Sequence, residues 1–495
     1  MEDDTLVGAR TPLLKHATTD DDVTMGHASW STEDELDGDF GGTLARQELE
    51  KKLLWKVDKR MSILVLIYIL NFIDRNNAGA ARLRGFEEDL GLKGQQFATV
   101  LSILYVGYIS MQIPSNVFMN HIGKPSIYLP ACMAVWGLIS VMTGFAHNFF
   151  DVLLTRLLLG VVEASFFPGA LFLISKWYKH SELGSRTALL FCGNIISNAF
   201  GALIASAILD HMDGVLGRAA WRWLFYIEGS LTVLAALLAM AVLPDFPETT
   251  RAGWLTEAEV RLAVRRMHED ADAHAAPGAR PAHAFVLAVR DPNVWILVVA
   301  MFFQVVSNSF TAWFPTIVAT LGYSRTATLL LCAPPYVCTA VLTYFVSRHS
   351  DAKGERFYHI TLPIWTSVAG LLLALCTLDV RARYLSFFLM TQSYAGFSVF
   401  YGWMSNSVPS PPAKRAVALA LVNALSQLGN VAGAYVWQPV WAPRFAPSFA
   451  VCAAASAAAV GCCVVLRRRL VKENARLKRV EVERGVGREG FRYLV

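Results

Sequence analysis

Four charged residues interrupt stretches of sequence that are otherwise apolar. Asp74 and Arg75 are adjacent in one stretch, and Arg156 and Glu163 lie in another. Charged side chains are rare and costly inside apolar segments, so each one is a candidate for ligand binding, proton exchange or helix pairing. A guanidinium grips a carboxylate with two parallel hydrogen bonds, and removal from water favours the neutral form of a carboxylic acid. The four residues therefore indicate a site that handles an anion and a proton.

The segments that carry these charges have the length and composition of membrane spans. Of 495 residues, 54% are hydrophobic and 17% are charged, which lies outside the usual range of soluble domains. A bilayer core requires roughly 20 mostly apolar residues per helix. Such stretches are expected at 61–82, 96–119, 126–146, 149–174, 186–209, 223–243, 292–319, 326–347, 358–378, 384–408, 413–437 and 443–466. The sequence thus predicts an all-α polytopic membrane protein with about twelve transmembrane helices.

The spans form two groups of six, with polar segments before, between and after them. Thr256 and Glu259 precede a short apolar run in the central segment, which is typical of a capped amphipathic helix, and a linker rich in Ala, His, Pro and Gly follows. The acidic first segment is expected to be disordered. The predicted units are a disordered tail (1–55), a six-helix bundle (56–243), a connecting loop (244–290), a second six-helix bundle (291–467) and a basic tail (468–495).

Lys and Arg accumulate on one side of this arrangement, although the opposite loops are not free of them. By the positive-inside rule, the basic side is cytoplasmic, together with both termini and the connecting loop. We expect a multi-pass protein of the plasma membrane. The residues that set this orientation are Lys51, Lys52, Lys56, Lys59, Arg60, Lys176, Lys179, Arg186, Arg348, Lys353, Arg356, Lys414 and Arg415.

Four segments carry a specific resemblance. They are Phe-Ile-Asp-Arg-Asn-Asn at 72–77, Gln-Ile-Pro-Ser-Asn at 112–116, Arg-Leu-Leu-Leu-Gly-Val-Val-Glu-Ala at 156–164 and Trp-Arg-Trp-Leu-Phe at 221–225. Together they resemble the major facilitator superfamily, and within it the anion:cation symporters, nearest to the fungal allantoate and nicotinate permease group. The likeness covers about residues 55–470. It implies the major facilitator fold and proton-linked movement of a carboxylate such as a vitamin, a ureide or a small peptide, without choosing among them.

The chain departs from the superfamily pattern in one loop. The loop after the second span, 116–124, lacks the acidic residue that the resemblance would place there, whereas 350–356 keeps Asp351 and Arg356. We therefore assign gating to Asp351 and Arg356. Asp74 is also interpreted as a gating residue, because neighbours on a helix point about 100° apart and Asp74 need not face a cavity with Arg75.

Arg75 and Arg156 are predicted to lie at similar depth. Each stands about seven residues from the outer end of its span, and the two spans run in opposite directions. If both spans line the cavity, as the resemblance implies, the two guanidiniums make an anion site. Glu163 lies two helical turns beyond Arg156, roughly 10 Å deeper, and is assigned to proton coupling. Ion pairs that only hold helices together remain an alternative explanation for all four charges.

Polar side chains in the second half complete the predicted substrate site. Gln304 and Asn308 share one helix face, and Tyr401 lies in a later span. Interhelical hydrogen bonding explains such residues equally well, but these three are the preferred substrate contacts.

No Walker loop, zinc-spaced Cys/His set or nucleophile elbow occurs in the sequence, so we expect no enzyme activity, no cofactor and no metal. A net charge of +5 implies no nucleic-acid partner. The expected protein is a monomeric, proton-coupled importer of a small organic anion. An exporter of an acidic metabolite and a non-transporting nutrient sensor are the alternatives.

Overall fold

A computed structural model describes residues 40, 42–250, 253–274, 281–408, 412–483 and 492–495, and every regular element in these ranges is helical. Ten helices among the described residues are long and apolar enough to cross a membrane. The prediction of an all-α polytopic membrane protein is confirmed.

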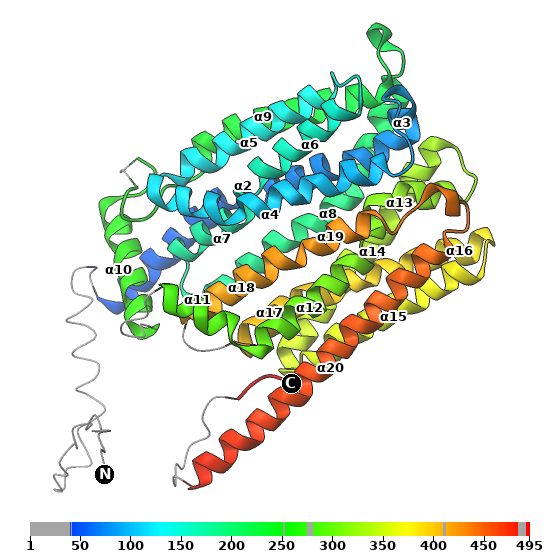
Figure 1. Cartoon of the computed structure of the whole chain (residues 1–495). Coiled ribbons are helices and arrows are strands. Elements are labelled where there is room, and N and C mark those ends of the chain that lie inside the picture. Colours follow the sequence, from blue (N-terminus) through cyan, green and yellow to red (C-terminus); the bar gives the residue numbers. More distant parts are fainter. Residues whose placement is uncertain (1–39, 41, 251–252, 275–280, 409–411, 484–491) are drawn as a thin grey trace, which may run out of the picture.

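The first half of the chain forms one group of helices in Figure 1. Short elements, η2 (Arg82–Arg84), α3 (Phe86–Asp89) and η3 (Val215–Gly217), connect its long helices at one end. The long helices are α2 (Thr43–Ala81), α4 (Gln96–Ile122), α5 (Pro125–Thr143), α6 (Phe149–Glu163) followed by α7 (Phe166–Trp177), α8 (His180–His211) and α9 (Ala220–Val242).

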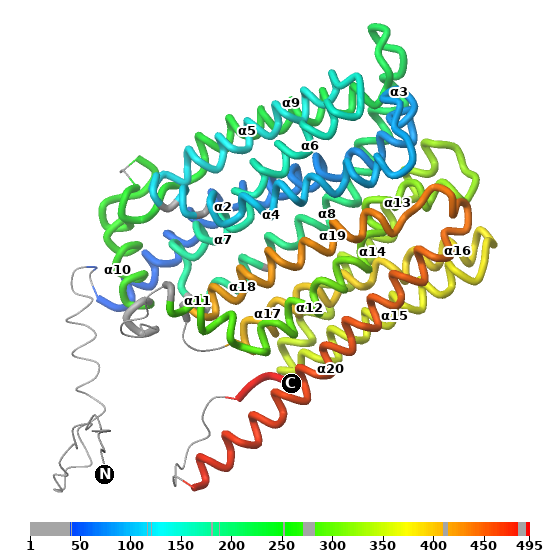
Figure 2. Tube along the Cα trace, in the orientation of Figure 1, coloured from blue at the N-terminus to red at the C-terminus, as the bar shows by residue number. Residues whose placement is uncertain are grey.

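The second half forms a second group beside the first, and the tube in Figure 2 shows the two groups running along a common direction. Several of its predicted spans are divided into two helices. The elements are α12 (Pro292–Ser307) with α13 (Phe310–Ala319), α14 (Arg325–Lys353), α15 (Phe357–Cys376), α16 (Val380–Thr391) with η4 (Gln392–Gly396) and α17 (Phe397–Ser407), α18 (Pro412–Ser426) with α19 (Leu428–Ala434), η5 (Pro439–Trp441) and α20 (Ala446–Glu483).

Two of the twelve predicted spans lie outside the ten apolar helices. In α2, Asp74, Arg75 and the neighbouring asparagines dilute the apolar stretch. In the span at 384–408, η4 divides the helix into α16 and α17, each too short to cross alone. Both segments nevertheless pack within their own halves, α2 against α8 and α9, and α16 against α15.

The span that carries Arg156 and Glu163 is broken immediately after Glu163. α6 ends at Glu163 and α7 begins at Phe166. Pro168 has no N–H to offer the carbonyl of Ala164, and its ring would clash with that carbonyl in a continuous helix. The break therefore follows from the sequence, and it places Glu163 at the last turn of α6.

Two helices extend beyond the predicted spans. α2 begins at Thr43, so residues 43–55, expected to be disordered, are helical; residues 1–39 and 41 lie outside the described part. The reason is packing, because Leu53 and Val57 lie one turn apart and are both buried in the same apolar cluster. α20 likewise continues to Glu483, through most of the segment expected to be a basic tail.

The connecting loop contains the predicted capped helix, α10 (Glu257–His274). Thr256 N–H donates to Glu259 Oε2 at 2.8 Å, and Glu259 N–H donates to Thr256 Oγ1 at 3.3 Å, which is a capping box. Lys56 of α2 pairs with Glu259 at 2.7 Å. Burial alone would raise the pKa of Glu259, but the hydrogen bonds from Lys56 and Thr256 outweigh it and lower the pKa.

The connecting segment joins both halves at one end of the molecule. α10 packs against α2 and α7, and α11 (Pro281–Val289) packs against α12 and α18. The predicted linker at 275–280 lies outside the described residues. In Figure 1, α2 begins beside α10, and α20 projects beyond the bundle on the same side; we call this the connector end.

Small residues bring α4 and α6 into backbone contact. A Cβ added at Gly160 would lie 1.9 Å from the carbonyl oxygen of Leu104, and one added at Gly107 would lie 2.5 Å from that of Leu157. Because backbone cannot move aside as a flexible side chain can, glycine is required at both positions. The contact fixes the helix turns that carry Arg156 and Glu163 relative to α4.

We expect Gly160→Ala to separate α4 from α6 and to destabilise the protein by about 1–3 kcal/mol, the usual cost of overpacking. Gly461→Ala in α20 is the matched control, because nothing lies within 4 Å of a Cβ added there. Alanine at Gly461 should be neutral or stabilise by up to about 1 kcal/mol through helix propensity. Thermal unfolding of both variants in the same detergent measures the difference, and equal melting temperatures would contradict the prediction.

Candidate functional site

A buried ion pair joins α2 to the last turn of α6. Arg75 Nη2 and Nε donate to Glu163 Oε2 at 2.7 and 3.0 Å. The exposed fractions of the two side chains are 9% and 0%. Spacing along α6 separates Glu163 from Arg156 as expected, but it does not reveal this partner from α2. The predicted anion-binding and proton-coupling residues are therefore in direct contact.

Aromatic rings surround the guanidinium of Arg75. Its central carbon lies 5.0, 5.6 and 5.0 Å from the ring centroids of Phe72, Tyr105 and Tyr108. Each ring attracts the cation through its negative face. Aromatic contacts also cross between the two halves, where the ring centroids of Phe191 in α8 and Tyr401 in α17 are 4.7 Å apart.

Arg156 lies against the backbone of Arg75 and has N–H groups that are not used in hydrogen bonds to the described residues. Its exposed fraction is 1%, and its Nη1 donates to the carbonyl oxygens of Arg75 and Asp74 at 3.3 and 3.5 Å. Nε and Nη2 have no hydrogen-bond partner within the described ranges. Arg156 thus reaches the level of residues 74 and 75, in line with the expected depth. A buried guanidinium with free N–H groups can bind a carboxylate bidentately.

Asp74 faces away from the Arg75–Glu163 pair. Its Oδ1 accepts from Ser140 of α5 at 3.1 Å, and its Oδ2 accepts from Thr232 of α9 at 2.9 Å. Its exposed fraction is 1%. From the sequence, Asp74 is predicted to be a gating residue. The structure places it inside the first half, where these contacts connect three helices.

The predicted substrate contacts of the second half form small hydrogen-bonded groups. Gln304 Nε2 donates to Asn308 Oδ1 at 3.1 Å, and Ser393 donates to the same oxygen at 2.8 Å. Tyr401 donates to Asn423 Oδ1 at 3.3 Å. Gln304 Oε1 has no partner among the residues described. The structure therefore brings Gln304 and Asn308 together and gives Tyr401 a separate partner.

The two predicted gating residues of the second half are bonded to each other. Arg356 Nη1 donates to Asp351 Oδ1 at 2.6 Å, in the turn between α14 and α15 at the connector end. The same nitrogen donates to Ser350 Oγ at 3.0 Å. The exposed fractions of the Asp351 and Arg356 side chains are 69% and 16%.

Contacts between the halves close the end opposite the connector. Tyr435, just after α19, has its hydroxyl 3.1 Å from Thr99 Oγ1 and 3.3 Å from Ser102 Oγ of α4. The guanidinium of Arg82 lies beside the rings of Phe97 and Trp313, 4.9 and 4.4 Å from their centroids. These cross-half contacts have no signal in the sequence, because partners far apart in the chain share no spacing.

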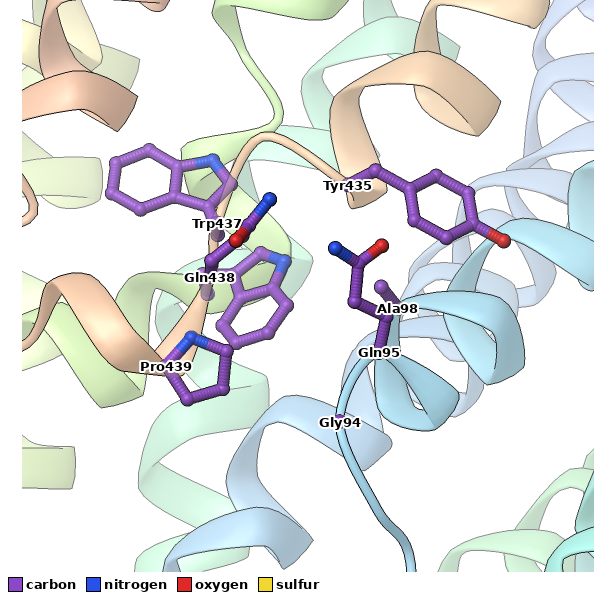
Figure 3. Close-up of a pocket in the computed structure, with 8 residues that line it drawn as sticks. Gly94, Gln95, Ala98, Tyr435, Trp437, Gln438 and Pro439 are labelled. Carbon is purple, nitrogen blue, oxygen red and sulfur yellow. The ribbon is translucent and has the colours of Figure 1, made fainter.

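A narrow pocket lies at this closed end, and Figure 3 shows the segment after α19 facing the start of α4 across it. Tyr435, Trp437 and Gln438 line one side, and Gln95 and Ala98 line the other. The two halves meet around this pocket, and their side chains do not fill it.

Sequence reasoning missed a buried charge inside one of the predicted spans. Glu228 in α9 has an exposed fraction of 2% and lies within the predicted span 223–243. The rule that selected Asp74, Arg75, Arg156 and Glu163, a charge inside an apolar span, applies equally to Glu228.

Comparisons with known proteins agree on one family. A model described as Major Facilitator Superfamily matches residues 64–434. "MFS-type transporter cnsO" of Penicillium expansum is 32% identical over 396 residues, covering 77% of this chain and 75% of that protein. A "putative tartrate transporter" of Agrobacterium vitis is 30% identical over 389 residues, covering 78% and 84%. A crystal structure of a bacterial homologue of the human lysosomal transporter Spinster matches with a TM-score of 0.62 and 17% identity, covering 83% of this chain and 97% of that one.

We predict that Tyr435→Phe loosens the closed end. The substitution removes the hydroxyl that contacts Thr99 and Ser102, and hydrogen bonds of this kind each contribute about 0.5–1.5 kcal/mol. Hydrogen exchange of the amides at 96–102 should therefore speed up by about 2–10-fold. Tyr384→Phe is the control, because the Tyr384 hydroxyl donates to the carbonyl of Leu331 within the second half. Equal exchange in both variants would exclude this contact as part of the closure.

Proposed function

Because this chain belongs to the Major Facilitator Superfamily, we propose that it imports a small organic anion together with protons, by alternating access between its two bundles. The chain is a membrane transporter of that superfamily; the anion, the protons and the direction are the proposal. The substrate class is a carboxylate such as nicotinate, allantoate or another vitamin.

The observation that carries the proposal is the buried guanidinium of Arg156 with two unused nitrogens. Buried N–H groups without an acceptor are costly, above all on a charged group. The bonds of Arg156 to the carbonyls of Arg75 and Asp74 use Nη1 alone. A carboxylate that accepts from Nε and Nη2 would complete the hydrogen bonding of Arg156.

The Arg75–Glu163 pair supplies the link to protons. When Glu163 is ionised, its Oε2 accepts two hydrogen bonds from Arg75 and holds that guanidinium. When Glu163 takes up a proton, the ionic attraction is lost and Arg75 is released toward an incoming anion. Proton binding and anion binding then favour each other, which is the thermodynamic requirement for symport.

The second half contributes uncharged groups to the proposed site. Gln304 has a buried carbonyl oxygen without a partner in the described part of the chain, and Asn308 and Tyr401 carry further polar atoms. We assign these residues to substrate recognition, and Asp351 and Arg356 to gating at the connector end. One relative is named as a putative tartrate transporter, and tartrate is a small carboxylate, which supports the substrate class.

The proposed setting is the plasma membrane, with both termini and the connecting segment in the cytoplasm and with a monomer as the working unit. The basic residues before α2 and in the turns at the connector end support this orientation. The end closed by Tyr435 and Arg82 would then face outward.

The test is uptake of radiolabelled nicotinate, allantoate and tartrate at an external pH of about 5 and about 7.5, with and without a protonophore. Wild-type uptake should be higher in acid and should be lost with the protonophore. Arg156→Ala should lower apparent affinity by about 10–100-fold, because hydrogen bonds to a charged group contribute about 1.5–3 kcal/mol. Arg381→Ala, at an exposed position at the start of α16, is the matched control and should transport normally.

Glu163→Gln separates coupling from binding in the same assay. The amide cannot exchange a proton, so residual uptake should no longer depend on external pH or on the protonophore. Uptake by Glu163→Gln that keeps the wild-type pH dependence would exclude Glu163 as the coupling residue. Efflux of the labelled anions from preloaded cells, without uptake, would overturn the import direction.

A further inference from the structure

Glu228 is a buried carboxyl group that the proposed mechanism does not use. It lies in α9 with an exposed fraction of 2%, and neither carboxylate oxygen has a hydrogen-bond partner among the described residues. Asp74 and Asn77 of α2 are its polar neighbours. Asn77 is itself 3% exposed, and its Nδ2 lacks a partner within the described ranges.

Glu228 is also shielded from lipid and water by close helix packing. A Cβ added at the next residue, Gly229, would lie 2.7 Å from both the carbonyl oxygen of Gly137 and the backbone nitrogen of Val141. α5 and α9 therefore touch backbone to backbone beside Glu228. An ionised carboxylate at such a place, with no cation beside it and only the uncharged amide of Asn77 nearby, would cost several kilocalories per mole, so the group keeps a proton instead.

The charges of the first half support the same conclusion. Five ionisable groups lie together in α2, α6 and α9: two guanidiniums, Arg75 and Arg156, and three carboxyl groups, Asp74, Glu163 and Glu228. Arg75 neutralises Glu163, and Arg156 lies against the backbone of Asp74. Two cations balance two carboxylates, so one carboxyl group must be neutral for the cluster to carry no net charge.

We propose that Glu228 holds a proton inside the first bundle and is coupled electrostatically to Asp74, so that these two carboxyl groups form a proton-binding site separate from Glu163. Neighbouring carboxyl groups cannot both ionise readily, and their protons belong to the pair. The charged groups facing the pair are Arg156 from α6 and, through it, Glu163; from α5 and α9 the contacts of Asp74 are the uncharged hydroxyls of Ser140 and Thr232.

Anion binding at Arg156 would also affect the charges of the Asp74–Glu228 pair, and this step rests on the proposed function. A carboxylate that occupies the free nitrogens of Arg156 withdraws the positive charge that compensates Asp74. Asp74 then takes up a second proton more readily, beside the one that Glu228 holds at rest. When the anion leaves, Arg156 faces Asp74 again and the second proton is released. The proton held by Glu228 at rest does not depend on any substrate.

The first experiment detects that resting proton by infrared spectroscopy of the purified full-length protein without substrate. Wild type should show the carbonyl stretch of a buried protonated carboxyl group at neutral pH, and Glu228→Gln should lose it. Asp74→Asn should retain the band, because Glu228 is still present, and Glu88→Gln, at an exposed position, is the neutral control. Retention of the band in Glu228→Gln, or its loss in Asp74→Asn alone, would overturn the assignment to Glu228.

The second experiment measures thermal unfolding against pH. As pH rises, the Glu228 carboxyl of the wild type is increasingly forced to ionise beside Asp74, whereas the side chain at this position in Glu228→Gln stays neutral. The variant should therefore be the more stable protein at pH about 9, by about 2–4 °C, and the two should converge in acid. Parallel curves would contradict a titrating Glu228, and a wild-type curve stabilised by Na⁺ but not K⁺ would instead indicate a sodium site.

Failure of this proposal is distinguishable from failure of the proposed function. The infrared and unfolding measurements contain no substrate, so they read Glu228 even if no tested anion is transported. Conversely, acid-stimulated uptake that depends on Glu163, combined with an unprotonated Glu228, would leave symport intact and remove only the Asp74–Glu228 site.

Discussion

Charge compensation without water is the constraint on which the first half depends. Inside a membrane-spanning bundle, each ionised group must find its partner on another helix. Arg75 forms an ion pair with Glu163, and Asp74 accepts hydrogen bonds from the hydroxyls of Ser140 and Thr232. These contacts tie α2 to α5, α6 and α9 over distances that only close helix packing allows. The glycines at the α4–α6 and α5–α9 crossings therefore also support these contacts, because bulkier residues would push the helices apart and separate the charged groups from their partners.

The predicted sites of the two halves use different kinds of polar group, charged in the first half and uncharged in the second. The predicted site of the second half instead contains buried amides and a hydroxyl, those of Gln304, Asn308 and Ser393. Neutral groups are far cheaper to bury than charges and respond little to pH. An anion and a proton would therefore be sensed mainly by the first half, while the second half would determine the shape and hydrogen-bonding pattern of an accepted ligand.

The sequence predicts the helices well and the contacts between helices poorly. Apolar length located the spans, and Pro168 accounts for the break after Glu163, but amphipathic packing extended α2 back to Thr43 and α20 on to Glu483. Depth counted along the helices brought Arg75 and Arg156 to one level. It did not foresee the Arg75–Glu163 pair, because an arginine side chain spans more than a helical turn and its direction is set by packing. Glu228 was within reach of sequence reasoning, whereas Tyr435, Thr99 and Ser102 share no pattern that would pair them.

The closed end shows what a change of conformation must break. The contacts between the halves there include the hydroxyl of Tyr435 against Thr99 and Ser102, and the guanidinium of Arg82 beside the rings of Phe97 and Trp313. Hydrogen bonds and cation–π contacts each contribute about 0.5–2 kcal/mol. Buried apolar side chains of both halves, Phe97 and Trp313 among them, also form one cluster at this end, so opening it must separate apolar surface as well. The ion pair of Arg75 with Glu163 lies within the first bundle, where the movement can leave it intact, whereas the contacts of the closed end lie between the bundles, where the movement must break them.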